Sequence, residues 1–133
     1  MTFLGAWVVP AERCWNRSLT PLAVQIVKHM GSGPVYLSFD IDSLDPAHAP
    51  GTGSIEPGGL TLAQALELIR GLRGLKIIGF DLVEVSPPLD PFGSTALMAA
   101  NLMFEMLCIL PGVQYRPAHD PMSFRADLPS DWV

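Results

Sequence analysis

The sequence predicts an α/β protein in which parallel strands are joined by crossover helices. Two observations carry this prediction: apolar runs alternate with helix signals along the chain, and hydrophobic residues make up 49% of the 133 residues while charged residues make up only 16%. Strands of a parallel sheet are buried on both faces, so their sequences are apolar runs. Each connection between parallel strands must return the chain from one end of the sheet to the other, and a helix usually makes that crossover.

The first part of the chain carries signals for two strands and one helix. A short apolar run predicts a strand at 6–9. Thr20-Pro21 opens a helix at 21–30, because threonine caps free amide groups and proline suits the first helical turn. A second apolar run predicts a strand at 35–39.

The middle of the chain combines a long loop with the next helix and strand. Residues 44–60 are rich in glycine and proline, and a loop of this length inside a compact domain is usually functional or disordered. Thr61 and Gln64 form a capping box, which predicts a helix at 62–71. The apolar run at 75–85 predicts a third strand that ends near Glu84. We therefore expect a sheet of at least three parallel strands.

The last helix is expected at 95–110, with Ser94 as its cap. A membrane-spanning helix needs about 20 apolar residues. The segment is shorter than that and contains Glu105, so we interpret it as a core or interface helix and not as a membrane span. It should expose an apolar face. Residues 1–110 are interpreted as the folded part of the chain, and the proline-rich residues 111–133 as an extended or disordered tail.

Charge and cysteine content exclude several classes of protein. The net charge is −5, the isoelectric point is about 4.9 and the few basic residues are scattered, which argues against a nucleic-acid partner. Two cysteines are too few for a disulfide scaffold. No targeting signal precedes the first helix, because the apolar N-terminal residues lack a basic leader.

Three acidic residues fall where ligands collect in parallel α/β sheets, beyond the carboxyl ends of the strands. Asp40 and Asp42 follow one expected strand, and Glu84 ends the next. Residues two apart on a strand point to the same face, so Asp40 and Asp42 would repel unless a cation or a shared proton lies between them. Carboxylate oxygens suit Mg²⁺, Ca²⁺ or Mn²⁺. The alternative is that both aspartates cap loop amides.

Five segments follow one another in order around these carboxylates: Ser38-Phe39-Asp40-Ile41-Asp42, Asp45-Pro46, Pro50-Gly51-Thr52-Gly53, Gly58-Gly59-Leu60-Thr61 and Asp81-Leu82-Val83-Glu84-Val85-Ser86-Pro87-Pro88. Their content and order resemble the signature of the arginase/agmatinase (ureohydrolase) family. The Ser-Pro-Pro ending resembles the agmatinase branch more than arginase, and so does the upstream segment Ala11-Glu12-Arg13-Cys14-Trp15.

The resemblance implies a three-layer α/β/α fold with a mostly parallel sheet, present here as an incomplete portion. It implies hydrolysis of a guanidino group to urea and an amine by two manganese ions that bridge a hydroxide. Asp40 and Asp42 would be manganese ligands, Glu84 would pair with the substrate guanidinium, and Thr52 would lie close to the substrate or to Glu84. Asp45 would fix the loop.

The resemblance also carries expectations about partners and compartment. The substrate would be a small guanidino compound such as agmatine or guanidinobutyrate, and no catalytic residue is assigned. Complete family members are homo-oligomers, and we expect no membrane partner. Cytoplasm and mitochondrion both stay open as compartments, since the chain carries no targeting signal.

The sequence departs from the family pattern at two places. Ser54-Ile55 stands where the family has Thr-Pro, which should loosen that loop. The Gly-Gly-Asp-His and Asp-Ala-His-x-Asp segments are missing, and with them four of the six metal ligands that the family uses. The sequence therefore suggests the C-terminal half of an agmatinase-like hydrolase, from a truncated gene product or a fragmentary gene model, that is inactive alone. The alternative is a non-catalytic α/β module that binds or modulates a full-length homologue.

Overall fold

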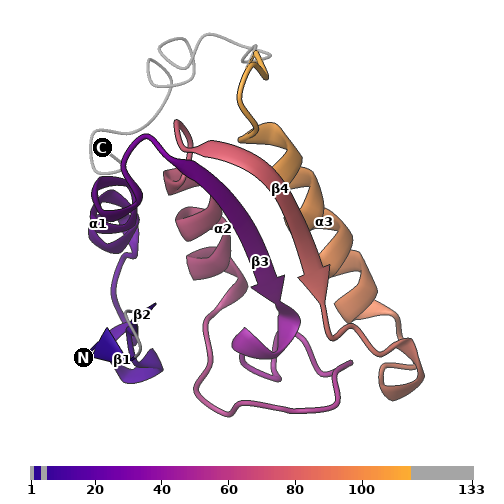
Figure 1. Ribbon diagram of the computed structural model, residues 1–133. Coiled ribbons are helices and arrows are strands. Elements are labelled where there is room, and N and C mark those ends of the chain that lie inside the picture. Colours follow the sequence, from indigo (N-terminus) through magenta and orange to yellow (C-terminus); the bar gives the residue numbers. More distant parts are fainter. Residues whose placement is uncertain (1, 4–5, 115–133) are drawn as a thin grey trace, which may run out of the picture.

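The computed structural model describes residues 2–3 and 6–114 of the chain. Figure 1 shows the order of its elements. They are β1 (Thr2–Phe3), β2 (Ala6–Trp7), α1 (Thr20–Met30), β3 (Pro34–Asp40), α2 (Leu62–Gly71), β4 (Lys76–Val83) and α3 (Ser94–Cys108), with 3-10 turns at Ala11–Arg13, Ile41–Ser43 and Pro87–Leu89. The predicted helices and the second and third strands are present, with ends that differ by one or two residues. Most of the predicted 111–133 tail lies outside the described residues.

A parallel pair of strands, β3 and β4, forms the centre of the fold. The pairing runs from Pro34 opposite Lys76 to Asp40 opposite Val83, with one irregularity between Val35 and Tyr36. Helix α2 makes the crossover between the strands and lies with α3 behind the sheet (Figure 1). The core forms between these helices and the covered face of the sheet, from residues that include Phe39, Ile77, Ala65, Ile69, Leu102 and Met106.

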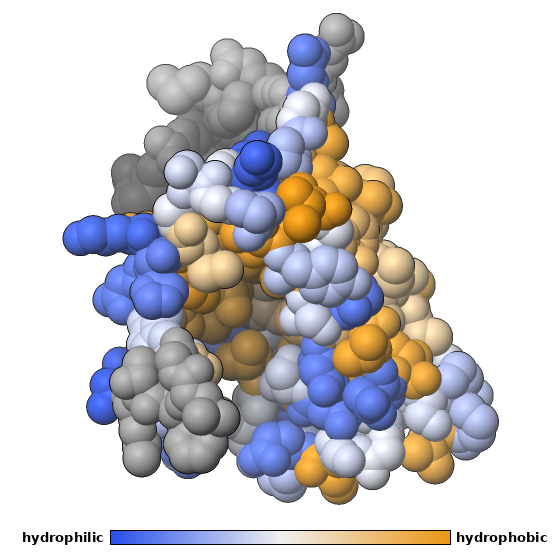
Figure 2. Space-filling view, viewed as in Figure 1, coloured by the Kyte–Doolittle hydropathy of each residue, from blue (hydrophilic) through white to orange (hydrophobic). Residues whose placement is uncertain are grey.

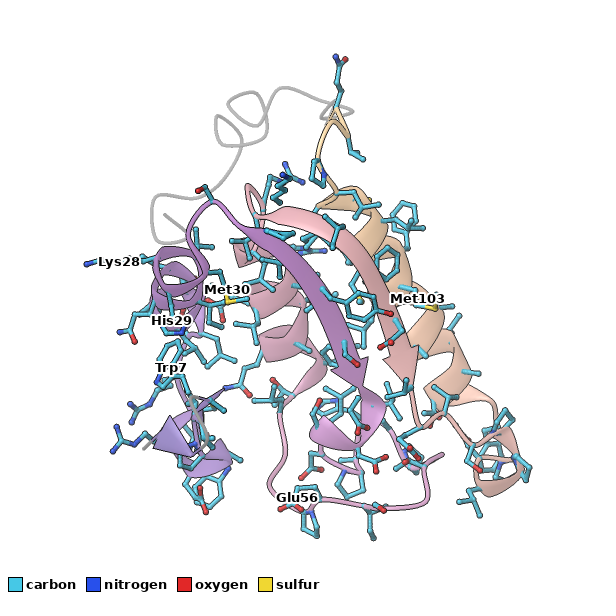
Figure 3. The ribbon with its side chains drawn as sticks, viewed as in Figure 1. Trp7, Lys28, His29, Met30, Glu56 and Met103 are labelled. Carbon is cyan, nitrogen blue, oxygen red and sulfur yellow. The ribbon has the colours of Figure 1, made fainter. Side chains whose placement is uncertain are left out.

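The prediction of at least three parallel strands is wrong for the described residues. The first expected strand is cut to Ala6–Trp7, which pairs antiparallel with Thr2–Phe3 and not with β3. Pro10 has no amide hydrogen with which to extend a ladder. The Trp7 ring instead lies against the ring of His29 on α1, with 5.7 Å between their centres (Figure 3).

The prediction that the strands are buried on both faces is also wrong for the described residues. On the uncovered face of the sheet, Tyr36 is 59% exposed and Ile78 is 66% exposed. The hydroxyl groups of Tyr36 and Ser38 both donate to the Asp81 carboxylate there, over 2.9 and 2.6 Å. The described part of the chain thus supplies a sheet and one helical layer, which is two of the three layers expected for the complete fold.

Helix α3 packs on the sheet with one side only. Ala99, Leu102 and Met106 are buried, whereas Leu97 and Phe104 are 68% and 61% exposed, as the sequence predicts. Figure 2 shows apolar side chains gathered along the edge of the molecule that α3 forms. Within the described residues, no helix has the length and hydropathy that a membrane crossing requires.

Two of the three helices begin at caps that the sequence analysis did not predict. The capping box of Thr61 and Gln64 is present at α2. At α1, however, Thr20 does not cap the helix. The carboxylate of Glu67, on α2, accepts from the Leu19 and Thr20 amides over 2.8 and 3.2 Å, and from the hydroxyls of Ser18 and Thr20. At α3 the carboxylate of Asp90, not Ser94, accepts from a helix amide, that of Thr95, over 2.6 Å.

We expect Glu67→Gln to flatten the acid dependence of stability. Hydrogen bonds from Ser18, Thr20 and Leu19 lower the pKa of Glu67 from its usual 4.5 to about 2. Above pH 4.5 the carboxylate is ionised in both the folded and the unfolded chain, so its stabilisation is complete. As the pH falls from 4.5 to 2, the unfolded chain takes up the proton first, and this stabilisation is lost.

Urea denaturation of the wild-type chain between pH 5 and pH 2 checks this prediction. The free energy of unfolding should fall more steeply toward low pH in the wild type than in Glu67→Gln. Glu12→Gln removes one exposed carboxylate from the nearby 3-10 turn and serves as the charge control. A Glu67→Gln variant with the acid dependence of the wild type would contradict the assignment.

Candidate functional site

The three predicted carboxylates meet at one edge of the sheet. Asp40 is the last residue of β3 and lies opposite Val83, and Glu84 follows Val83 at the end of β4. Because β3 and β4 are parallel, both strands bring their carboxyl ends to this edge (Figure 1). Asp42 lies two residues beyond Asp40, in the 3-10 turn Ile41–Ser43.

The sequence argument for placing Asp40 and Asp42 on one strand face is wrong. The strand ends at Asp40, and the turn that follows carries Asp42. One carboxylate oxygen of Asp40 accepts from the Asp42 amide over 2.9 Å, so Asp40 has the capping role of the alternative interpretation. A cap uses one oxygen of the carboxylate, and the other remains able to accept a further ligand.

Asp42 lies in the electrostatic field of the other two carboxylates. Burial raises the pKa of the Asp42 carboxyl, and the negative charges of Asp40 and Glu84 raise it further. The Asp42 carboxyl is therefore harder to ionise than an isolated aspartic acid, first because it is desolvated and second because the two neighbouring negative charges repel its ionised form. A cation bound among them would remove this repulsion.

Thr52 holds the side chain of Asp42 from the 44–60 loop. The Thr52 hydroxyl donates to Asp42 Oδ1, and Thr52 is only 4% exposed. The sequence placed Thr52 near the substrate or Glu84. That placement stays a prediction, and the hydroxyl bond to Asp42 shows that Thr52 orients one member of the carboxylate group.

Asp45 closes the base of the 44–60 loop, which agrees with the role expected for it. Its carboxylate accepts from the amides of Ala47 and Gly58 over 2.9 and 2.8 Å, and these bonds lower its pKa. Its own amide donates to the Leu60 carbonyl over 2.9 Å. The indole of Trp15 donates to the Gly58 carbonyl over 2.7 Å, which ties the loop to the segment before α1.

Glu84 has a backbone conformation that few residues adopt. Its φ is +67°, in the left-handed region that favours glycine, and it is one of two non-glycine residues with positive φ in the described part of the chain. Residues held in this region often lie at functional sites, where the surrounding structure fixes them. The turn it makes leads β4 out of the sheet and toward the Pro87–Leu89 turn.

The donor set fits part of a hard metal site. Carboxylate oxygens are the ligands that Mn²⁺ and Mg²⁺ prefer, and Asp40 and Asp42 offer them at one edge. Among the residues that the structure describes, no three His, Cys, Asp or Glu side chains converge closely enough to hold an ion by themselves. A separate hollow of about 700 Å³ next to α1 is lined by Trp7, Arg13 and Leu22 and by none of the three carboxylates.

Sequence reasoning missed the residues at the start of α3 that contact the loop carrying Thr52. Asp90 and Thr95 are buried at the start of α3, and Thr95 accepts a hydrogen bond from Gly51, next to Thr52. Asp90 lies before Gly93, the N-cap position of α3, so the usual N-cap pattern does not identify it. Nothing in the sequence indicates that Thr95 contacts a loop 44 residues earlier.

Comparison with known proteins gives consistent results. Residues 2–108 match the arginase family. The chain is 62% identical over 112 residues to guanidinobutyrase of Pseudomonas aeruginosa, and the aligned region covers 84% of this chain and 35% of the relative. It is 64% identical over 110 residues to a protein of Gallus gallus named mitochondrial agmatinase, and the aligned region covers 83% of this chain and 32% of the relative.

A solved structure gives the same result. The structure of a hypothetical agmatinase from Burkholderia thailandensis superimposes with a TM-score of 0.76 at 44% identity, over 80% of this chain and 34% of that one. The chain thus spans about a third of the length of these relatives. The predicted ureohydrolase fold is confirmed, as is the resemblance to agmatinases. By sequence and by fold, the chain belongs to the arginase family.

Proposed function

We propose that this chain supplies part of the active site of a manganese-dependent guanidino hydrolase of the agmatinase type. The observation that carries the proposal is the position of Asp40, Asp42 and Glu84 at the carboxyl ends of two parallel strands, where the charges of Asp40 and Glu84 act on Asp42. Membership in the arginase family and relatives named agmatinase and guanidinobutyrase support it.

Each residue has a role that follows from its chemistry. Asp40 and Asp42 would hold manganese, whose hard-ion preference their oxygens match. Bound manganese supplies a water-derived nucleophile at neutral pH. The Glu84 carboxylate would accept N–H groups of the substrate guanidinium, where a charge-assisted bidentate contact fixes its orientation. Thr52 keeps Asp42 in place by its hydrogen bond.

The substrate class follows from the charge of the site. A guanidinium group is planar and cationic, and Glu84 offers it an exposed carboxylate at the sheet edge. We propose agmatine as the first substrate to test and guanidinobutyrate as the second, in line with the names of the two relatives. Homo-oligomer formation and a cytoplasmic or mitochondrial location stay predictions.

We expect the 133-residue chain alone to bind Mn²⁺ weakly and to release no urea from agmatine. Its described residues offer two metal-binding carboxylates, whereas such an ion takes about six ligands. Without a complete set, the chain would not hold the two ions that such a reaction uses. Urea release by the purified chain with excess Mn²⁺ measures this. Turnover that Asp40→Ala abolishes would contradict the proposal that the chain holds only part of the site.

A chimaera tests the positive half of the proposal. The aligned 112 residues of Pseudomonas aeruginosa guanidinobutyrase are replaced by those of this chain, which keeps the rest of the relative unchanged. We expect manganese-dependent urea release from agmatine or guanidinobutyrate. A chimaera that folds and binds Mn²⁺ but releases urea from neither compound would overturn the proposal. In that case the non-catalytic module that modulates a homologue would be the better interpretation.

A further inference from the structure

Gly51, the residue before Thr52, is held by hydrogen bonds at both its backbone amide and its backbone carbonyl. Its amide donates to the Thr95 hydroxyl over 2.8 Å, and its carbonyl accepts from the Ser86 amide over 2.8 Å. Ser86 follows β4 and Thr95 lies in the first turn of α3, so the loop is fastened to two other elements. The next side chain along the loop, Thr52, is the one that donates to Asp42.

The contact between the loop and α3 is tight and buried. A Cβ added at Gly51 would lie 2.7 Å from the Asp90 Cβ and 2.8 Å from the Thr95 Oγ1. Thr95 is 1% exposed and Asp90 is 5% exposed. The loop backbone therefore rests directly on these two side chains, at a distance that only glycine allows.

Thr95 is itself fixed by an ionised anchor. Its amide donates to Asp90 Oδ2 over 2.6 Å, and its hydroxyl lies close enough to contribute to the lowered pKa of the Asp90 carboxyl. Together with Ser94 and the Phe92 amide, these bonds lower the pKa of Asp90 to about 2, so the anchor stays charged at neutral pH. The Thr95 hydroxyl oxygen then accepts from the Gly51 amide with a lone pair.

We propose that Thr95 is a positioning residue for Asp42, acting through Gly51 to set where the Thr52 hydroxyl lies. The inference deepens the proposed function, because it names a residue outside the carboxylate group on which the metal ligand depends. Thr52 stands between two glycines, and a Cβ at Gly53 would meet open space. The backbone before Thr52 is held by the bonds of Gly51 to Thr95 and Ser86 and by the Thr52 amide, which donates to the Pro50 carbonyl over 3.0 Å, whereas the backbone after Thr52 continues into open space at Gly53.

Two substitutions at position 95 separate the hydroxyl from the shape of the side chain. Thr95→Val keeps the shape but removes the acceptor for Gly51, and Thr95→Ser keeps the hydroxyl. The first measurement needs no metal: three-bond couplings in the full chain report the χ1 rotamer of Thr52. We expect one rotamer in the wild type and in Thr95→Ser, and averaging among rotamers in Thr95→Val.

Manganese affinity of the full chain gives the second measurement, by calorimetry. Removing a group that orients a metal ligand typically lowers affinity 10- to 100-fold. We expect Thr52→Val to fall in this range and Thr95→Val to lose about tenfold. The double variant should bind no more weakly than Thr52→Val alone, because both changes act through one hydroxyl. Thr61→Ala removes a hydroxyl from the α2 cap and should leave the affinity and the Thr52 rotamer unchanged.

The results separate this inference from the proposed function. A wild-type chain that binds no Mn²⁺ would count against the metal assignment, whereas the Thr52 rotamer would still decide the role of Thr95. One Thr52 rotamer in Thr95→Val would overturn the inference, and so would averaging in Thr61→Ala. If Thr95→Val does not fold, amide exchange in the wild type decides: Gly51 should exchange far more slowly than exposed Gly53, and equal rates would overturn the inference.

Discussion

Asp42→Asn should lower kcat/KM of the guanidinobutyrase chimaera about a thousandfold, which corresponds to about 4 kcal/mol of lost transition-state stabilisation. Asparagine has the shape of aspartate, so the Thr52 hydroxyl keeps an oxygen to which it can donate. The substitution removes the negative charge that would hold manganese. Metal ligands act as a unit, and losing one should cost more than an equal share of the activity.

The control removes the same charge from the 44–60 loop, which follows the turn that carries Asp42. Glu56 lies at the outer side of the 44–60 loop (Figure 3) and is exposed. Glu56→Gln should keep most of the activity, and urea release with Mn²⁺ measures both variants. Asp42→Asn with more than a tenth of the parent activity would contradict the assignment of Asp42 as a metal ligand. Equal losses in both variants would indicate a general effect of charge.

Gly59→Ala should cost the chain about 3 kcal/mol of its free energy of unfolding, a large part of the stability of a small domain. A Cβ at this position would lie 2.8 Å from three backbone atoms, those of Ser43, Leu44 and Asp45. Backbone atoms cannot turn aside as the end of a long side chain does. The methyl group would therefore force apart the hydrogen bonds that join Leu60 to Ser43 and Asp45.

Gly53→Ala is the matched control, because it lies in the same loop and its Cβ would meet open space. It should change the free energy of unfolding by no more than about 0.5 kcal/mol, or raise it slightly by restricting the unfolded chain. Urea denaturation measures both variants. Similar losses in the two would show that the close approach at Gly59 does not determine the conformation of the loop.

The sequence predicts the elements whose signals are local. Thr61 and Gln64 are three residues apart and identify the start of α2, which the structure confirms. The apolar runs identify β3 and β4, and the parallel pairing then places Asp40 and Glu84 at one edge. These features are predictable because the helix cap depends on residues close in sequence, and because the carboxyl ends of parallel strands always lie at the same edge of a sheet.

The remaining features depend on contacts between distant parts of the chain. Glu67 caps α1 from 47 residues away, and Thr95 contacts Gly51 across 44 residues. Neither pairing leaves a pattern in the sequence, because a carboxylate or a hydroxyl can satisfy any amide it reaches. The length and pairing of the first strand were predicted wrongly for a related reason. An apolar run indicates that a segment is buried, but it does not indicate which strand the segment pairs with.

The exposed side of α3 was predicted from its apolar sequence, and its consequence stays a prediction. Leu97, Phe104 and Leu107 present their side chains to solvent on the helix that also buries Leu102 and Met106. An exposed apolar patch of this kind usually marks a surface that another element or chain covers. The 133-residue chain should therefore associate at high concentration.

The closed base of the 44–60 loop separates the stem of the loop from its exposed tip. The bonds of Asp45 and Leu60 shut the loop at its stem, and residues 53–57 at its tip are exposed. The tip can change in length and chemistry while Asp42 and Thr52 keep their places, since the stem does not transmit the change. If the proposed function holds, selection would have a region in which to adapt recognition of the far end of a substrate while the chemistry at the guanidinium end stayed constant.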